Sequence, residues 1–127
     1  MAKYVQDGAV AKRLLIVDDD ARFRDLLRMV LEDSPDFEVV GEAHEGAAAM
    51  AAAQQLDPDV VLLDVHLPDT TGFELTPRLA AEAGAPAVVL TSSRGDETYQ
   101  QLAHEAGASG FVPKHELSVA AIKEALG

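Results

Sequence analysis

Short apolar runs alternate with helix-like stretches along most of the chain, and this alternation constrains the fold more than any other feature. The apolar runs span residues 14–17, 39–40, 60–63, 87–90 and 110–112. They lack the polar–apolar alternation of half-exposed strands, which indicates strands that are buried on both faces. Such strands, separated by helices, form βαβ units. The sequence therefore predicts an α/β fold with a parallel sheet covered by helices on both sides.

Five helices are predicted between and after these runs. In the first, apolar residues recur at the spacing of one helix face: Phe23, Leu26, Leu27, Val30 and Leu31. The second spans 45–56 and is rich in Ala, the best helix former, and the others span about 71–83, 96–106 and 118–126.

Local signals bear on where two of these helices start. Asp20 is expected to cap the first helix. Thr71 and Glu74 match a capping box, which favours a start of the third helix at Thr71. Pro77 leaves two possibilities, because it removes a backbone hydrogen bond: this helix either kinks or begins near Thr76.

Length, charge and cysteine content exclude several classes. The 127 residues fit one domain, which we place at 13–127 after a tail of 1–12. No Cys is present, which excludes disulfides and thiol chemistry. A net charge of −12 with only ten Lys and Arg argues against direct nucleic-acid binding. Neither a signal peptide nor an apolar stretch of membrane-spanning length is visible, so we expect a cytoplasmic protein that does not bind membranes.

Polar residues that bear chemistry follow the predicted strands. Ligands of open parallel sheets bind at the carboxyl ends of the strands. The residues at those ends are Asp18 and Asp19, Asp64, Thr91 and Ser92, and Lys114.

These groups suit a cation and a phosphoryl group. Clustered carboxylates need a cation to be ionised together, and a ligand set made only of oxygens favours Mg²⁺, held by Asp18 and Asp19. The ammonium of Lys114 and a Thr or Ser hydroxyl suit phosphoryl oxygens. Asp64 stands alone at its strand end, and its carboxylate is the candidate nucleophile for an aspartyl phosphate.

Four motifs in this order carry a specific resemblance: "LLIVDDD", "VVLLDVHLPDTTG", "VVLTSS" and "AGASGFVPK". Over residues 13–126 the chain resembles the receiver domain of two-component response regulators. Pro113 before Lys114 resembles the receivers that precede LuxR/NarL-type DNA-binding domains. The resemblance implies a flavodoxin-like, doubly wound sheet of five parallel strands in the order 2-1-3-4-5.

The resemblance also implies roles for individual residues. Asp64 would accept a phosphoryl group from a sensor histidine kinase, and Asp18, Asp19, Asp64 and the backbone carbonyl of His66 would hold Mg²⁺. Thr91 and Lys114 would bind the phosphoryl oxygens.

Three positions are implied to act in switching or in timing. Phe111 matches an aromatic switch residue, and His66 and Ser93 match positions that tune dephosphorylation. The face formed by the fourth helix, fifth strand and fifth helix would then control an effector and support a homodimer. The effector is expected to be a DNA-binding domain that this chain does not contain.

Three other functions are possible on the same pattern. A phosphorylation-independent interaction module on this fold is the main alternative, although such receivers usually lose the acidic pair, the acceptor Asp or the Lys. A phosphatase of the haloacid dehalogenase type would need a second acid at position 66, where this chain has His. A flavin-binding protein would need a phosphate-binding loop after the first strand. We therefore expect a signalling switch whose only chemistry is its own phosphorylation and dephosphorylation, not an enzyme that acts on an outside substrate.

Overall fold

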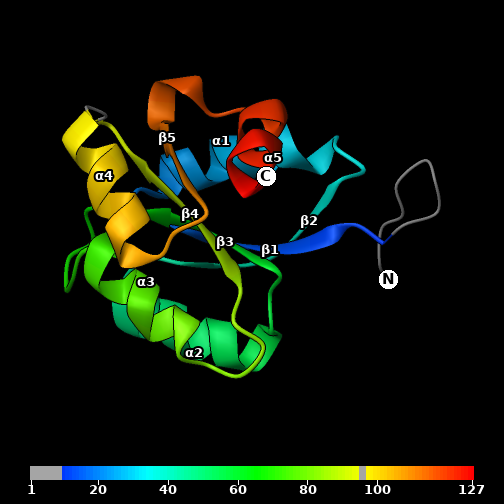
Figure 1. The fold of residues 1–127 in the computed structure, drawn as a ribbon. Helices are drawn as coiled ribbons and strands as arrows, with labels where there is room; N and C mark the ends of the chain where they lie inside the picture. Colours follow the sequence, from blue (N-terminus) through cyan, green and yellow to red (C-terminus); the bar gives the residue numbers. More distant parts are fainter. Residues whose placement is uncertain (1–9, 95–96) are drawn as a thin grey trace.

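The computed structural model describes residues 10–94 and 97–127. The predicted parallel α/β sheet is confirmed: five parallel strands lie in the order β2-β1-β3-β4-β5, with helices on both faces (Figure 1). The strands are β1 (Lys12–Val17), β2 (Phe37–Ala43), β3 (Val60–Asp64), β4 (Ala87–Ser92) and β5 (Gly110–Pro113). The helices are α1 (Ala21–Glu32), α2 (Gly46–Leu56), α3 (Gly72–Ala80), α4 (Glu97–Ala106), the short 3₁₀ helix η1 (Lys114–Glu116) and α5 (Val119–Leu126).

Some predicted positions lie outside the described residues. These are residues 1–9 of the expected tail and Asp96, the expected first residue of the fourth helix. Within the described part, β1 begins at Lys12, which the sequence assigns to the tail.

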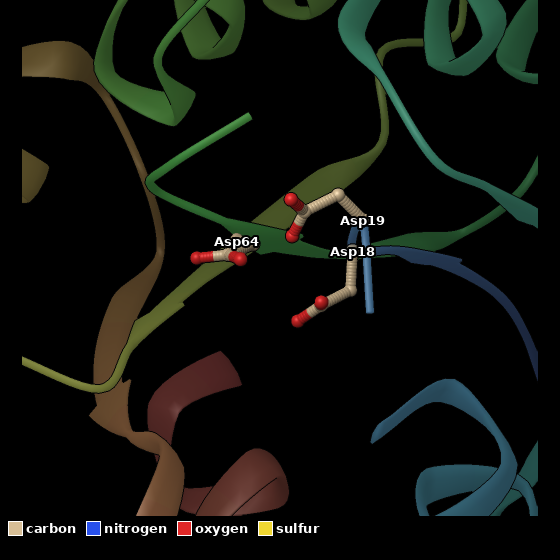
Figure 2. A group of neighbouring side chains, drawn as sticks. All are labelled: Asp18, Asp19 and Asp64. Atoms are coloured by element: carbon tan, nitrogen blue, oxygen red, sulfur yellow. The ribbon is translucent and has the colours of Figure 1, made fainter. Parts of the chain in front are cut away.

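The order of the strands decides which strand ends are neighbours. β1 pairs with β3, and β3 pairs with β4. The carboxyl ends of β1 and β3 therefore lie side by side, and Figure 2 shows Asp18 and Asp64 there.

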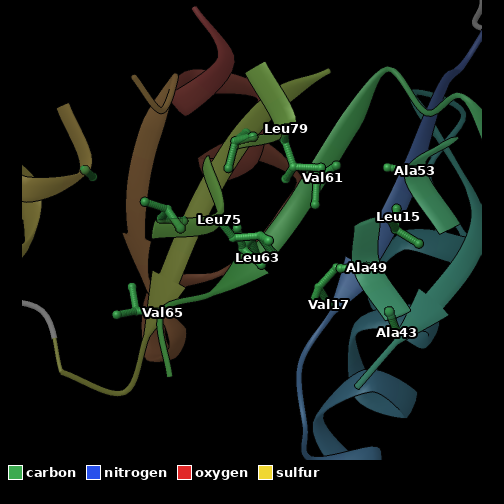
Figure 3. Packing of buried hydrophobic residues seen from close by; sticks show 13 residues of the cluster. Leu15, Val17, Ala43, Ala49, Ala53, Val61, Leu63, Val65, Leu75 and Leu79 are labelled. Atoms are coloured by element: carbon green, nitrogen blue, oxygen red, sulfur yellow. The ribbon is translucent and has the colours of Figure 1, made fainter. Parts of the chain in front are cut away.

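Alternate residues of the buried strands face two separate cores. On one side, Leu15, Leu63 and Leu90 belong to a cluster with residues of α2, α3 and α4 (Figure 3). On the other side, Ile16 and Leu62 pack with residues of α1 and α5. Both faces of the central strands are thus apolar, which explains why their sequences show no alternation.

Only part of the predicted apolar face of α1 is buried. Leu27 and Leu31 lie in the core, at 4% and 0% exposure. Leu26 and Val30 are 54% and 40% exposed, because the helix rests on the sheet along a stripe narrower than its apolar face.

Each strand is longer than the apolar run that predicted it, and β2 differs most. β2 runs over Phe37–Ala43, far beyond the predicted 39–40, and most of its residues are only partly buried. As an edge strand it carries Glu and Gly, which weaken its apolar signal. β4 extends to Ser92, so it ends in Thr91 and Ser92 as predicted.

Side-chain caps fix the starts of three helices. Asp20 caps α1 as predicted, accepting hydrogen bonds from the amides of Arg22 and Phe23. Ser118 caps α5 in the same way.

The alternative prediction, that the third helix begins near Thr76, is wrong. The Oγ1 of Thr71 accepts a hydrogen bond from the amide of Glu74 at 3.1 Å, so α3 begins at Gly72 and continues through Pro77. The hydroxyl of Thr76 donates to the carbonyl oxygen of Gly72 at 2.7 Å, within the same turn.

Candidate functional site

Three carboxylates meet at the carboxyl edge of the sheet. Asp18 and Asp19 follow β1, and Asp64 is the last residue of β3. Each offers an oxygen atom, and these oxygens lie within 4.8 Å of one another (Figure 2). Asp18 and Asp64 are only 1% and 4% exposed, whereas Asp19 is exposed to solvent. The structure thus brings together the three acidic residues selected from the sequence.

Lys114 reaches this cluster from the carboxyl end of β5, the edge strand of the sheet. It is the first residue of η1, directly after β5. Its Nζ lies 2.7 Å from Oδ2 of Asp18 and 3.2 Å from Oδ2 of Asp64. The ammonium also lies 4.4 Å from the ring centre of Phe23, a distance typical of a cation–π contact.

The surroundings shift the pKa values of two of these groups. Burial raises the pKa of Asp64 above its usual range, and the neighbouring charge of Asp18 adds to this effect. The amide of His66 and the ammonium of Lys114 act in the opposite direction but do not outweigh it. Burial alone would lower the pKa of Lys114, but its close contact with Asp18 and the charges of Asp64 and Asp18 raise it.

Hydrogen bonds from α1 and from the residue that precedes it hold Asp18 in position. The guanidinium of Arg24 donates a hydrogen bond to the carbonyl oxygen of Asp18 at 2.6 Å and a second to Glu42 on β2 at 2.9 Å. The amide of Asp20 donates to Oδ1 of Asp18 at 2.8 Å. These bonds fix the direction of the chain where β1 ends.

Of the two hydroxyls at the end of β4, that of Thr91 is available for a ligand. Thr91 is paired with Asp64 across the sheet and is 1% exposed. Within the described ranges, its Oγ1 has no hydrogen-bond partner. The hydroxyl of Ser92 already accepts a hydrogen bond from the amide of Arg94 at 3.0 Å. Because a buried hydroxyl without a partner is costly, Thr91 Oγ1 is suited to meet an incoming oxygen.

The loop after Asp64 folds tightly around this carboxylate. The amide of His66 donates a hydrogen bond to Oδ1 of Asp64 at 3.1 Å. Gly72, at the start of α3, passes so close that a Cβ there would lie 2.9 Å from the carbonyl oxygen of Asp64. A side chain at position 72 would therefore displace the end of β3.

The remaining predicted residues lie around this centre. Ser93 is exposed just beyond the end of β4. Phe111 lies on β5 and is partly buried against the core on the side of α2, α3 and α4. His66 is exposed, and its Nε2 lies 3.0 Å from the hydroxyl of Tyr99 on α4.

Sequence reasoning missed three contributors to this region. Phe23 was assigned to a helix face, although its ring lies against Lys114. The carboxylate of Asp69 accepts hydrogen bonds from the amides of Gly46 and Ala47, at 2.7 and 3.0 Å, and so caps α2 from another loop. Tyr99 was not singled out. No local pattern distinguishes these residues, because their contacts join parts of the chain that are distant in sequence.

The residues present fit a hard divalent cation. All three carboxylates supply oxygen atoms, which Mg²⁺ prefers. Oδ2 of Asp18 is buried and, among the described residues, lies in an ion pair with Lys114 but in no hydrogen bond of good geometry. A divalent cation would give that oxygen a second cationic partner beside Lys114.

The sheet order and the cluster define a doubly wound α/β protein with an acidic site at its carboxyl edge. Residues 14–126 match the family described as response regulator receiver domain, and the chain belongs to this family. This confirms the resemblance drawn from the four motifs.

The similar proteins differ in how much of their own length this chain covers. The chain is 34% identical over 105 residues to the chemotaxis protein CheY of Halobacterium salinarum, covering 83% of this chain and 86% of that protein. It is 38% identical over 103 residues to a protein-glutamate methylesterase/protein-glutamine glutaminase of Alkalilimnicola ehrlichii, covering 80% of this chain but 26% of that protein. The chain spans about a quarter to a third of the methylesterases that it matches.

A solved structure agrees with the fold. The signal receiver domain of NarL from Mycobacterium tuberculosis superposes with a TM-score of 0.81 at 30% identity, covering 92% of this chain and 98% of that one. This similarity agrees with the predicted likeness to NarL-type receivers. In the described part of the chain, no helix has both the length and the apolar character needed to cross a bilayer.

Proposed function

We propose that this receiver accepts a phosphoryl group on Asp64 and passes the signal to an effector through the face formed by α4, β5 and α5. The observation that carries the proposal is the meeting of Asp18, Asp19, Asp64 and Lys114 at one sheet edge. The buried hydroxyl of Thr91, which has no hydrogen-bond partner among the described residues, supports the same proposal.

The transfer is a displacement at phosphorus. A carboxylate oxygen of Asp64 forms a bond to the phosphorus of a phosphohistidine on a sensor kinase. The P–N bond breaks, and its electron pair stays on the histidine nitrogen. The phosphoryl group is later lost by hydrolysis: a water oxygen bonds to the phosphorus, and the bond between phosphorus and the Asp64 oxygen breaks. Its electron pair returns to the carboxylate, and the protons of the water leave with inorganic phosphate or pass to solvent.

The residues of this chain contribute position and charge. Asp18, Asp19, Asp64 and the backbone carbonyl of His66 would hold Mg²⁺. When bound, this ion neutralises charge on the phosphoryl oxygens and so lowers the barrier to transfer. Lys114 lies 3.2 Å from Oδ2 of Asp64, close enough to pair with a new phosphoryl oxygen.

Phosphorylation then biases a two-state element. It adds up to two negative charges and three acceptor oxygens at Asp64. Thr91 moves toward these oxygens, and the space that it leaves allows the ring of Phe111 to turn inward. The surface of α4, β5 and α5 changes shape as a result and engages the effector or a second copy of the chain.

The proposed partners follow from this role. They are a sensor histidine kinase and an effector, which we propose to be a DNA-binding domain. His66 and Ser93 tune how long the phosphoryl group stays. This chain would not bind nucleic acid or membranes directly, and we propose that it acts in the cytoplasm.

Intact mass spectrometry tests this function directly. The protein and its Asp64→Asn variant are incubated with acetyl phosphate, with and without Mg²⁺. We expect one added phosphoryl group in the parent protein, dependent on Mg²⁺ and absent in the variant. If no adduct forms at early time points, a phosphorylation-independent interaction module becomes the better interpretation.

A further inference from the structure

Four aromatic rings form a cluster between Asp64 and the face formed by α4, β5 and α5. They are His66 in the loop after β3, Phe73 on α3, Tyr99 on α4 and Phe111 on β5. Tyr99 contacts the other three, with ring centres 5.9, 5.5 and 6.1 Å from those of His66, Phe73 and Phe111. Phe73 and Phe111 meet Tyr99 edge to face, the geometry that aromatic pairs prefer. Tyr99 is therefore the hub of this aromatic cluster.

His66 connects the cluster to the acceptor residue. Its amide donates to Oδ1 of Asp64 at 3.1 Å, while its Nε2 lies 3.0 Å from the hydroxyl of Tyr99. The same residue is thus bonded to the acceptor carboxylate through its backbone and to α4 through its side chain. The loop that carries it is closed by a bridge between His66 and Thr71, so a change at Asp64 is passed on by a short, constrained segment.

Tyr99 connects the cluster to the switch residue at its other side. Its ring packs against Phe111 at an interplanar angle of 80°. Phe111 pairs with Leu90 across β4 and β5, one residue before Thr91. A turn of the Phe111 ring would change the edge that it presents to Tyr99.

We infer that Tyr99 is a positioning residue that couples the acceptor loop to the face of α4 and β5. Its hydroxyl bonds to His66, and its ring contacts Phe111 and so responds when that ring turns. The inference rests on the proposed role of Asp64 as phosphoacceptor. The hydroxyl is the part that matters for the loop, because a Phe at position 99 keeps the ring contacts and loses the bond to His66. With that bond in place, the amide of His66 stays directed at Asp64. Without it, the loop is looser and water reaches the aspartyl phosphate more easily.

A double-mutant cycle on the phosphorylated protein tests this coupling. Tyr99→Phe, His66→Leu and the double variant are phosphorylated with acetyl phosphate and Mg²⁺, and the loss of the added mass is followed after the donor is removed. One lost hydrogen bond corresponds to about a three- to tenfold faster loss in each single variant. The double variant should be no faster than either single variant, because both remove the same bond.

Two further variants separate positioning from general destabilisation. His66→Gln keeps a polar group near the former position of Nε2 and should restore a rate close to that of the parent. His104→Leu replaces an exposed His elsewhere on α4 and should leave the rate unchanged. A Tyr99→Phe rate within twofold of the parent, or effects of the two single variants that multiply in the double variant, would overturn the inference.

The intrinsic fluorescence of Tyr99 gives a second test of the coupling. It has two Tyr and no Trp, so Tyr4→Phe leaves Tyr99 as the only tyrosine. We expect the emission of Tyr99 to change on phosphorylation, and the change to vanish with Asp64→Asn and to shrink with His66→Leu. An adduct seen by mass without any change in emission refutes the coupling alone. If the parent protein forms no adduct, the proposed function fails and the coupling fails with it.

Discussion

Replacing the carboxylate of Asp64 by an amide should stabilise the metal-free protein. Asp64 is 4% exposed and lies among two other carboxylates and one ammonium. Asp64→Asn keeps the size and an acceptor oxygen for the amide of His66, but it removes the buried charge. We predict a free energy of unfolding about 1–3 kcal/mol higher at pH 7 in the presence of a chelator.

The magnitude follows from the contacts of Asp64. At an effective dielectric constant of 20, a carboxylate oxygen at the 4.8 Å limit of the cluster repels it by about 3 kcal/mol, and an ammonium at 3.2 Å attracts it by about 5 kcal/mol. Asp19 is exposed and its repulsion is screened, so these two charge terms leave a net attraction of about 2 kcal/mol, which offsets part of the remaining cost. What remains is the desolvation of a buried carboxylate, which costs several kcal/mol. The bond from His66 offsets part of this cost, by about 1.5–3 kcal/mol.

The pH dependence gives the prediction a distinct signature. Burial raises the pKa of Asp64, so the folded state of the parent protein binds a proton more tightly than the unfolded state does. The cost of the charge is fully present above the raised pKa and disappears as the pH falls below the ordinary value for Asp. The stability difference between variant and parent should therefore be largest near neutrality and should shrink toward pH 4.

Urea denaturation of both proteins over this pH range, in a chelator, measures the difference. An increase on the order of 5–10 °C in Tm is the corresponding thermal result at neutral pH. Asp25→Asn, which changes an exposed carboxylate on α1, is the matched control and should stay within about 0.5 kcal/mol of the parent. A variant that is no more stable than the parent at pH 7, or a difference that grows as the pH falls, would refute the reasoning.

Addition of Mg²⁺ should raise the Tm of the parent protein more than that of Asp64→Asn, because a ligand that binds only the folded state stabilises it; equal shifts would argue against Asp64 as a ligand. Thr91→Val should leave the resting stability unchanged or raise it by up to about 1 kcal/mol, since the hydroxyl has no partner within the described ranges, and a loss above 1 kcal/mol in urea would contradict this. Gly72→Ala should cost about 1–3 kcal/mol in the same assay, because its Cβ would meet the backbone of β3, and an unchanged midpoint would show that the loop yields freely. Asp69→Ala should speed amide exchange at Gly46 and Ala47. The hydrogen bond from Gly46 lowers the pKa of Asp69, so in the parent this protection should persist above the ordinary pKa of Asp and be lost as the pH falls through the lowered value.

Several parts of this protein could be read from local sequence. The buried strands are continuous apolar runs, so β1, β3 and β4 were recognisable without any tertiary information. The caps of α1 and α3 were predicted correctly for the same reason: the polar side chain and the amides that it binds lie within three residues. The edge strand β2 was only partly recognised, because a strand with one free edge does not need a continuous apolar sequence.

The sequence by itself determined that carboxylates, a hydroxyl and an ammonium stand at strand ends, since this follows from where each apolar run stops. The tertiary structure decided which of them meet. It placed Lys114 between Asp18 and Asp64, left the hydroxyl of Thr91 without a partner in the described part of the chain, and joined His66 to Tyr99, 33 positions later. Periodicity and capping are local properties of the chain, whereas these contacts depend on the strand order and on how α4 packs against the sheet, and those are fixed only when the whole core is assembled.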